Sequence, residues 1–366
     1  MPLDARAEAW ARLVLLQLPA PTIAALLRAF GSAEDIFAAS RSQVAAATTP
    51  AAAQKLLARS DERALDGIRA WLGGDSHELV AWDDSDYPQA LFSMPDAPPA
   101  LFFIGRRELL NRPALAIVGS RHATPQGIEN AHNFAATLSQ AGLVIVSGLA
   151  LGIDTAAHEG ALEGPGSTIA CIGTGPDRVY PASNRDLAHQ IAKSGAILSE
   201  FIPGTPPLRH NFPRRNRLIS GLARGVLVVE ATLSSGSLIT ARLAAEQGRD
   251  VFAIPGSIHS PFSRGCHRLI RDGAKLVETA QDVIEELRVP GLSPIPVTEP
   301  GTQCAATRLP SPHHEIVTAL GGDPCDLDVL ISRTHLEPQT VTAALIELEL
   351  DGQVAALPGG RWQRVA

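Results

Sequence analysis

An arginine-rich segment contains the residue types that point most directly to chemistry. Five arginines and no acidic residue lie between positions 201 and 229, and the densest part reads RHNFPRRNR at 209–217. Guanidinium groups bind phosphates, and an aromatic ring offers a base a face for stacking. A solvated charged surface would normally mix acids with bases. The segment therefore predicts contact with single-stranded nucleic acid, largely independent of base sequence.

The residues of this segment are not expected to act alike. We expect Arg209 and Phe212 to face the nucleic acid, and at least one of Arg214, Arg215 and Arg217 to be structural. A structural arginine would support the site or pair with an acidic residue at a strand end. The predicted binding set from this segment is Arg209, Asn211, Phe212, Arg214, Arg215 and Arg217.

Small residues follow four predicted strands, with GSR at 119–121, SGLALGID at 147–154, GTG at 173–175 and ATLSSGS at 231–237. In a doubly wound sheet, ligands bind at the carboxyl ends of the strands. Exposed backbone amides and helix N-termini bind anions there. The alternative is that these glycines only make tight turns, but four such loops on one edge favour a phosphate-binding floor. The predicted residues are Gly119, Ser120, Arg121, Ser147, Gly148, Ser235 and Gly236.

Catalytic arrangements are weakly supported. Asp154 and His158 are four residues apart on one predicted helix face, with Ser147 nearby in sequence. No GxSxG motif accompanies the serine, so we favour a structural role in which Asp154 caps the helix and His158 satisfies a buried polar group. Glu200 and Glu230 end two strands and are candidates for an acid pair, without an evident base or metal set. We expect no enzymatic activity.

Cofactor and metal motifs are also missing. The loop GSRHATPQG at 119–127 lacks the GxGxxG spacing, and no Walker lysine pattern occurs. The four cysteines, at positions 171, 266, 304 and 325, form no CxxC pair, which argues against a metal site or a disulfide framework. We predict no cofactor and free thiols in a reducing compartment.

The elements that position these residues alternate along the middle of the chain. Apolar runs at 114–120, 142–148, 167–173, 196–200, 225–231 and 250–256 are separated by predicted helices at 126–141, 154–162, 185–194 and 237–247. Such alternation predicts an α/β fold with a Rossmann-like, doubly wound parallel sheet. The short runs ELVAWDD at 78–84 and ALFFIG at 100–105 are expected to add strands at its edge.

The flanking segments differ in pattern. Residues 1–72 have helical periodicity and predict a small domain similar to SAM or helix-hairpin-helix modules, although Ala20-Pro21 replaces the glycine-rich hairpin. The main domain is expected at 79–287. Residues 288–312 are rich in Pro, Thr and Gly and predict a linker. The pattern of helices and a glycine-marked strand pair at 313–366 predicts a winged helix.

Composition limits the possible classes of protein. The chain has 366 residues, of which 45% are hydrophobic and 19% charged, and its net charge is −7. No apolar run approaches the roughly 20 residues that span a bilayer, and residues 1–10 lack the layout of a signal peptide. We therefore expect a cytoplasmic protein without a membrane span. A local basic groove is compatible with net negative charge, because charges are screened beyond about 8–10 Å.

Several ungapped runs resemble the DNA-processing protein A (DprA/Smf) family. They are GSR (119–121), SGLALGIDTAAHEGAL (147–162), TIACIGTGPDRVYPASNRDL (168–187), SEF (199–201), HNFPRRNRLISGLA (210–223), the stretch at 228–256 and GCHRLIRDGA (265–274). The helical front segment and the winged-helix tail also fit the three-part layout of the family.

The resemblance implies a protein of natural transformation that binds and protects incoming single-stranded DNA. It further implies loading of the RecA recombinase for homologous recombination, dimerisation through the Rossmann-like domain, and no catalytic reaction. The family's DNA contacts fall here on Arg121, Arg209 and Phe212. Its dimer-forming region falls on 260–274, with Leu269 and Ile270, which could equally be core residues.

Two other classes stay open. One is a nucleotide-processing Rossmann-like enzyme similar to phosphoribohydrolases, although the loops GTGPD and LSSGSLIT lack the glutamate of the GGxGTxxE motif. The other is an adaptor whose modules bind only proteins. The acidic helices of the tail argue against tight DNA binding by the winged helix.

Overall fold

The computed structural model describes residues 4–57, 61–289, 311–320 and 324–365. In the N-terminal part, short helices pack around a small apolar core that includes the fully buried Trp10, Leu13 and Ile23. Side chains fix where several helices begin: Asp4 accepts a hydrogen bond from the Ala7 amide, as expected for an N-cap. These helices are α1 (Ala5–Leu15), α2 (Ala20–Phe30), α3 (Ala33–Ala38), α4 (Arg41–Ala47), α5 (Pro50–Leu57) and α6 (Glu62–Leu72).

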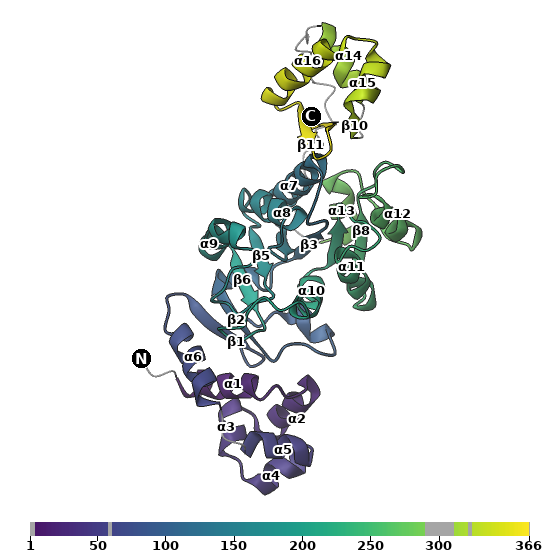
Figure 1. Cartoon of the computed structure of the whole chain (residues 1–366). Coiled ribbons are helices and arrows are strands. Elements are labelled where there is room, and N and C mark those ends of the chain that lie inside the picture. The colour runs from purple at the N-terminus through teal and green to yellow at the C-terminus, as the bar shows by residue number, and fades with distance from the viewer. Residues whose placement is uncertain (1–3, 58–60, 290–310, 321–323, 366) are drawn as a thin grey trace.

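A nine-stranded sheet forms the centre of the chain (Figure 1). All six predicted apolar runs are strands in it, and the two short runs form an antiparallel edge, β1 with β2 and β2 with β6. The sheet is therefore mixed, with its other strand pairs parallel. Its strands are β1 (His77–Ala81), β2 (Ala100–Gly105), β3 (Ala114–Val118), β4 (Val144–Ser147), β5 (Thr168–Cys171), β6 (Ala196–Ser199), β7 (Gly225–Val228), β8 (Asp250–Ala253) and β9 (Lys275–Leu276).

Helices cover both faces of this sheet. The side chains of β3 alternate between two apolar clusters: Ala116 joins one together with α10 and α11, and Ile117 joins the other together with α7 and α8. This alternation follows from the two-residue period of a strand and confirms the Rossmann-like fold. The helices are α7 (Pro125–Gln140), α8 (Ile153–Leu162), α9 (Arg185–Ser194), α10 (Asn211–Leu222), α11 (Ser237–Glu246), α12 (Arg264–Arg271) and α13 (Ala280–Leu287), with short 3-10 turns η1 (Gln89–Ser93), η2 (Arg107–Leu109) and η3 (Ala182–Asn184).

The order of the strands reverses once. They lie as β1-β2-β6-β5-β4-β3-β7-β8-β9, so the chain builds outward from β3 to β6, returns through α10, and continues from β7 on the other side of β3. The crevice between the carboxyl ends of β3 and β7 is therefore the topological switch point, where open α/β sheets bind ligands.

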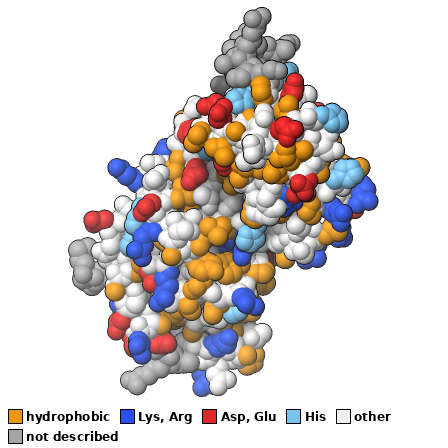
Figure 2. Space-filling view, turned by 45° about the horizontal axis from the view of Figure 1, so that its top comes forward, with side chains coloured by type: hydrophobic (Ala, Val, Ile, Leu, Met, Phe, Trp, Pro, Cys, Tyr) orange, Lys and Arg blue, Asp and Glu red, His pale blue; other side chains and the backbone are white. Residues whose placement is uncertain are grey.

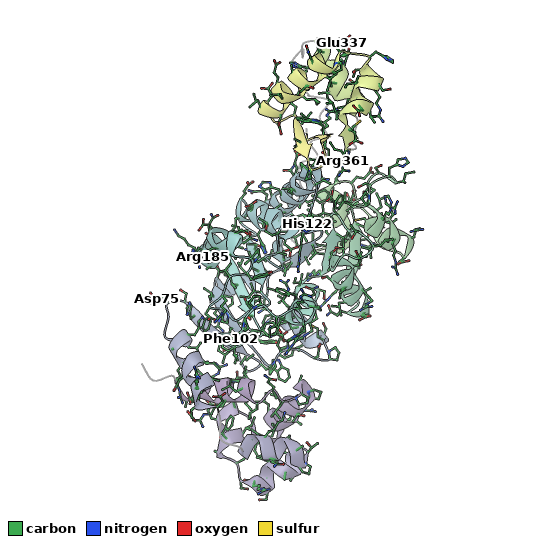
Figure 3. All side chains as sticks on the ribbon, viewed as in Figure 1. Asp75, Phe102, His122, Arg185, Glu337 and Arg361 are labelled. Atoms are coloured by element: carbon green, nitrogen blue, oxygen red, sulfur yellow. The ribbon has the colours of Figure 1, made fainter. Side chains whose placement is uncertain are left out.

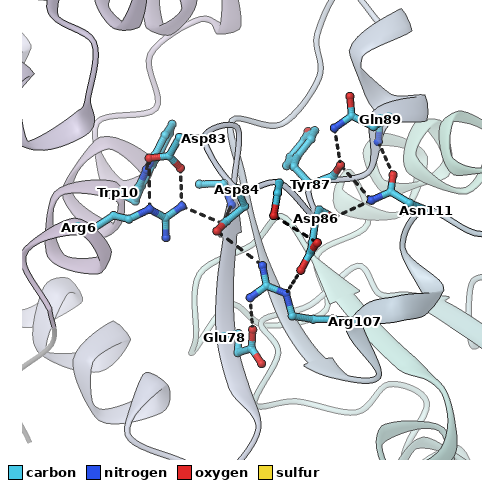
Figure 4. A network of polar contacts seen from close by, with 12 residues as sticks. Arg6, Trp10, Glu78, Asp83, Asp84, Asp86, Tyr87, Gln89, Arg107 and Asn111 are labelled. Carbon is cyan, nitrogen blue, oxygen red and sulfur yellow. Dashed lines mark hydrogen bonds and ion pairs between the residues drawn. The ribbon is translucent and has the colours of Figure 1, made fainter.

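A polar network joins the helical N-terminal part to the edge of the sheet (Figure 4). The Asp83 carboxylate accepts hydrogen bonds from Trp10 Nε1 at 2.9 Å and from Arg6 Nε at 3.2 Å. One apolar cluster also contains both Trp10 and Phe102 of β2, and Phe102 is labelled in Figure 3. The division of the chain at 72 and 79 stays a prediction, because helices and edge strands share this cluster.

The C-terminal part has helices and a three-stranded sheet in the order β10-β12-β11, which confirms the predicted winged helix. Its elements are α14 (Ser311–Leu320), β10 (Cys325–Asp326), α15 (Leu327–Thr334), α16 (Pro338–Leu350), β11 (Val354–Leu357) and β12 (Arg361–Arg364). The predicted linker at 288–312 lies largely outside the described residues. Within the described chain, no helix has the length and apolar character needed to cross a membrane.

Candidate nucleic-acid interface

A cleft of about 770 Å³ opens at the topological switch point. It lies between the loop after β3, the loop after β7 and the first turn of α10. Eight of the predicted binding residues line it: Gly119, Ser120, Arg121, Arg209, Phe212, Arg215, Ser235 and Gly236. The topology thus brings together residues that are more than 100 positions apart in sequence.

Two exposed arginines, Arg121 and Arg209, provide the positive charge of the cleft. Within the described residues, neither guanidinium forms an ion pair. The Arg121 guanidinium carbon lies 5.6 Å from the ring centroid of Phe212, within cation–π range. Elsewhere, acidic and basic side chains are interspersed on the face shown in Figure 2. The cleft therefore concentrates positive charge locally on a chain whose net charge is negative.

Two aromatic rings meet at one wall of the cleft. Phe212 and Tyr180 have centroids 5.6 Å apart with an interplanar angle of 41°. Phe212 rests on the backbone after β5, where a Cβ on Gly173 would lie 2.9 Å from the ring, so a side chain at this position would displace it. Tyr180 was not predicted as a site residue. The available signal was an aromatic residue just past β5, one of only two tyrosines in the chain.

The N-terminus of α11 adds backbone donors at the opposite wall. Gly236 precedes the helix, and no side chain caps it. The amides of Leu238 and Ile239 donate to Ser235 O and Gly236 O, so within the described residues the Gly236 and Ser237 amides are the ones left for an anion. A Cβ at Gly236 would meet nothing within 4 Å, so this stretch of backbone is open to a ligand. The side chains of Ser235 and Ser237 hydrogen-bond to each other at 2.7 Å.

The loop after β4 differs from the prediction. Its amides are not free, because Asp154 Oδ2 accepts from Gly148 N at 3.1 Å, and His158 Nε2 accepts from Leu149 N at 3.2 Å. Ser147 is fully buried and donates its hydroxyl to Ile117 O at 2.6 Å. The expectation of bare amides at four strand ends is therefore wrong at this loop, and the open part of the floor lies at β3 and β7.

Asp154 and His158 have the structural role that the sequence favoured, although Asp154 holds loop amides rather than capping α8. Thr168 Oγ1 donates to Ile145 O, so His158 Nδ1 must donate to Thr168 Oγ1 while Nε2 accepts. This arrangement fixes a neutral imidazole. Burial and, to a smaller extent, the positive charge of Arg215 lower the pKa of His158 to about 3.

We expect this histidine to make the protein acid-sensitive. The folded-state pKa lies below the unfolded value of about 6.5, so its contribution is complete above pH 6.5 and is lost as pH falls toward 3. The slope is about 1.4 kcal/mol per pH unit for one proton taken up on unfolding. Urea unfolding is measured from about pH 7.5 to about pH 4.5. The free energy of unfolding should depend less steeply on pH for His158→Gln than for the wild type. The same change at the exposed His189 should leave the dependence unaltered. Burial raises the pKa of Asp154, so this carboxyl group makes the fold less stable as pH rises. Both variants keep Asp154, so its effect cancels when they are compared.

The arginines of α10 are divided between the surface and the interior. Arg217 pairs with Glu200 and with Asp96, the latter at 3.3 Å. Arg214 also reaches Glu200, at 3.1 Å, but its side chain stays 57% exposed. Arg215 is buried and donates to the carbonyl oxygens of Gly148 and Cys171.

The predicted direct contacts of Arg215 and Arg217 with a ligand therefore do not fit this structure, because both guanidiniums are turned to protein acceptors. Asn211 is buried and lines a different cleft.

The two strand-end glutamates do not form an acid pair. Glu200 is held by arginines, whereas Glu230 accepts from Thr124 Oγ1 at 2.6 Å and Thr124 N at 3.0 Å. Burial raises the pKa of both carboxyl groups. Among the described residues, no group of three or more His, Cys, Asp or Glu is placed to hold a metal, and the three described cysteines are free and buried.

Leu269 and Ile270 lie on α12, half-buried and packed against the core of the sheet domain. Leu269 also lines a surface hollow of about 650 Å³ with Leu233 and Leu238, and Leu233 is 53% exposed. Each of the two predicted interface residues thus contributes to the core, while Leu269 reaches an apolar surface.

A doubly wound sheet with an arginine-lined cleft at its switch point, followed by a winged helix, defines a class of Rossmann-like proteins that carry a winged-helix domain. Residues 78–288 match the family of DNA recombination-mediator protein A, and residues 300–360 match the DprA winged helix domain. The chain belongs to the DNA recombination-mediator protein A family.

Relatives support this placement. Protein Smf of Escherichia coli is 42% identical over 305 residues, covering 81% of this chain and 80% of the relative. The DNA processing protein DprA of Streptococcus pneumoniae is 53% identical over 203 residues, covering 56% of this chain and 72% of the relative. Its crystal structure matches with a TM-score of 0.68 at 40% identity, covering 78% of this chain and 99% of that one.

A solved structure of DprA from Helicobacter pylori, described as showing a single-stranded DNA binding mode, has a TM-score of 0.53 at 33% identity. It covers 58% of this chain and 96% of that one.

Proposed function

We propose that this chain binds single-stranded DNA in the switch-point cleft and acts as a non-catalytic mediator of recombination. The observation that carries the proposal is the meeting of two guanidiniums, Arg121 and Arg209, that form no ion pair among the described residues, with an aromatic wall and the start of α11. Phosphates are bound by the arginines and by the Gly236 and Ser237 amides. A base stacks on Phe212, with Tyr180 beside it.

A single strand suits this cleft better than a duplex. In a duplex the bases are stacked on one another, so their faces are not available to Phe212 or Tyr180. In a single strand every base presents a face, which makes stacking tolerant of sequence. The Helicobacter pylori relative, whose structure is described as binding single-stranded DNA, supports the same choice.

The remaining predicted residues divide into three groups. Gly119, Ser120, Ser235 and Gly236 line the part of the cleft that approaches the phosphates. Ser147, Gly148 and Arg215 support it through contacts with protein groups. Asn211, Arg214 and Arg217 line a different cleft.

The wider role follows from the family. We propose that the protein protects incoming single-stranded DNA, helps to load RecA onto it during natural transformation, and works in the cytoplasm. We also propose a homodimer formed around Leu269 and Ile270, supported by the exposed Leu233, which lies beside Leu269 in a hollow lined by both apolar and charged residues. Full burial of Cys171 and the structural use of His158 favour a binding protein over an enzyme.

A direct titration tests the binding function. Labelled single-stranded DNA, the corresponding duplex and nucleoside monophosphates are each titrated with the full chain over a series of salt concentrations. Preferential, salt-dependent binding of the single strand supports the proposal. Tight binding of a nucleoside monophosphate with hydrolysis would instead favour the phosphoribohydrolase-like alternative, and no binding of any of the three would leave the adaptor class.

Removing the ring of Phe212 should weaken this binding. Phe212→Ala is expected to cost about 1–3 kcal/mol of stacking, or about 5- to 150-fold in Kd, whereas Phe212→Tyr keeps a ring and should bind almost normally. Phe92, another ring that is 47% exposed, lies outside the cleft and provides the matched control. Equal affinity of Phe212→Ala and wild type would exclude this ring as the stacking platform.

A further inference from the structure

A second cleft, of about 780 Å³, lies between the N-terminal helices and the sheet domain. One wall comes from α1 and α2, over residues 13–23. The other comes from residues 96–100, the end of β6 and the start of α10. Its volume falls within the range of small-molecule sites, roughly 300–1,000 Å³. The polar network around Asp83 fixes the helices against the sheet edge, so both walls are held in place.

The two clefts share the segment that leads into α10. Arg209 and Phe212 line the switch-point cleft, whereas His210, Asn211 and Arg214 line the second one. Successive helical residues are rotated by 100° about the axis, so neighbouring side chains point to opposite sides of this turn. The first turn of α10 is therefore a ridge between the clefts, and a chain that leaves Phe212 can cross it.

The electrostatics of the second cleft differ from those of the first. Its two arginines are neutralised, because Arg214 and Arg217 pair with the buried Glu200, and Arg217 also pairs with Asp96. The cleft therefore offers no unpaired cation to a phosphate. A neutral, flat group is better suited to it, packed against the apolar wall formed by residues such as Val14 and Leu18.

One buried side-chain donor in this cleft has no hydrogen-bond partner among the described residues. Asn211 is only 3% exposed, and its Nδ2 makes no hydrogen bond within the described chain. A buried amide donor without a partner is costly, by about 1–3 kcal/mol, and such groups call for an explanation. Each of the four DNA bases carries a ring nitrogen or carbonyl oxygen that accepts a hydrogen bond, so any base placed here could satisfy it.

We propose that the cleft between the N-terminal helices and the sheet domain is a subsite for a nucleobase of the bound strand. A nucleotide adjacent to the one stacked on Phe212 places its base there, its acceptor bonded to Asn211 Nδ2 and its face against α1 and α2. This inference rests on the proposed single-strand binding. It gives the N-terminal helices a direct part in holding the strand.

Photo-crosslinking tests this placement. Oligo(dT) strands that carry one 4-thiothymidine at successive positions are bound to the full chain, irradiated, and the crosslinked peptides are mapped. Crosslinks to residues 13–23 or 96–100 from positions next to those that crosslink to 119–122, Arg209 or Phe212 support the subsite. If the strands bind and all crosslinks fall outside 13–23 and 96–100, the subsite is overturned while the proposed function stands. If the strands do not bind, the proposed function itself has failed.

Two variants complete the test. Asn211→Leu removes the donor and should weaken a strand long enough to reach both clefts by about fivefold, the loss of one neutral hydrogen bond. It should leave a nucleoside monophosphate, which is too short to reach both clefts, unaffected. Ala20→Trp fills the cleft from the α2 side without touching a buried polar group and should abolish the crosslinks to 13–23. Ala46→Trp, on the exposed side of α4, is its matched control. Wild-type affinity and crosslinks in both cleft variants would overturn the subsite.

Discussion

Replacing Arg121 and Arg209 together with Ala is expected to weaken single-stranded DNA binding by about 100-fold or more at moderate salt. Each is exposed in the switch-point cleft without an ion pair among the described residues. A hydrogen bond to a charged group contributes about 1.5–3 kcal/mol, and two such losses correspond to about two to four decades in Kd. Fluorescence anisotropy with a labelled oligonucleotide measures this change directly.

The salt dependence gives a second readout of the same variant. For single strands, the slope of log Kobs against log salt is about −0.7 per neutralised phosphate, so losing two contacts should reduce it by about 1.4. A matched control replaces Arg63 and Arg224 with Ala, which removes the same charge. Arg224 belongs to the same acid-free stretch but precedes β7, at the opposite end of the sheet. If the control loses as much affinity as the cleft variant, and its salt dependence falls by the same amount, then DNA binding depends on the overall charge and not on the cleft.

The overall fold could be predicted because it depends on local patterns. Each of the six apolar runs contains a strand that ends one to three residues before the run does. The predicted helices at 126–141, 154–162, 185–194 and 237–247 match α7, α8, α9 and α11 to within one residue at each end. The short strand β9 (Lys275–Leu276) was not predicted, since two exposed residues carry no period. The antiparallel β2–β6 pairing was not predicted either, because strand direction at a sheet edge is a tertiary property.

The candidate site was only partly predictable, and the arginines show why. Within the basic segment, α10 begins at Asn211. A helix turns each successive side chain by 100°, so Arg215 points to the interior while Arg214 and Arg217, three residues apart, both reach Glu200. Charge composition identifies a basic segment. The helical phase, which depends on where the helix begins, decides which of its cations are exposed.

The loop after β4 shows a second limit. Small residues such as Gly148 indicate that a ligand can approach, but they do not show whether the amides are already used. Asp154 and His158, on the following helix, reach back and occupy those donors. The sequence shows that Asp154 and His158 lie only a few residues after this loop, but it does not show that their side chains point back to it.

Replacing Arg215 with Ala is expected to destabilise the fold rather than to remove a DNA contact. The guanidinium is buried, donates to the carbonyls after β4 and β5, and interacts with the buried Asp154 carboxylate. Removing it leaves two buried carbonyl oxygens without this donor, at about 1–3 kcal/mol each, and takes away a positive charge that acts on Asp154. Urea unfolding should show this loss. Arg214→Ala, whose side chain is 57% exposed, should cost about 1 kcal/mol or less.

A double variant separates the charge effect from simple loss of packing. If Arg215 stabilises the fold by compensating Asp154, then Asp154→Asn should cost less in the Arg215→Ala background than in wild type, with a coupling free energy of about 1 kcal/mol or more. Additive costs would mean that Arg215 acts only through its two carbonyl contacts. Arg215→Lys retains the charge but cannot bridge two carbonyls as a planar guanidinium does, so it should recover the coupling but only part of the stability. Together these variants distinguish an arginine that supports the cleft from the two, Arg121 and Arg209, that are proposed to bind the strand.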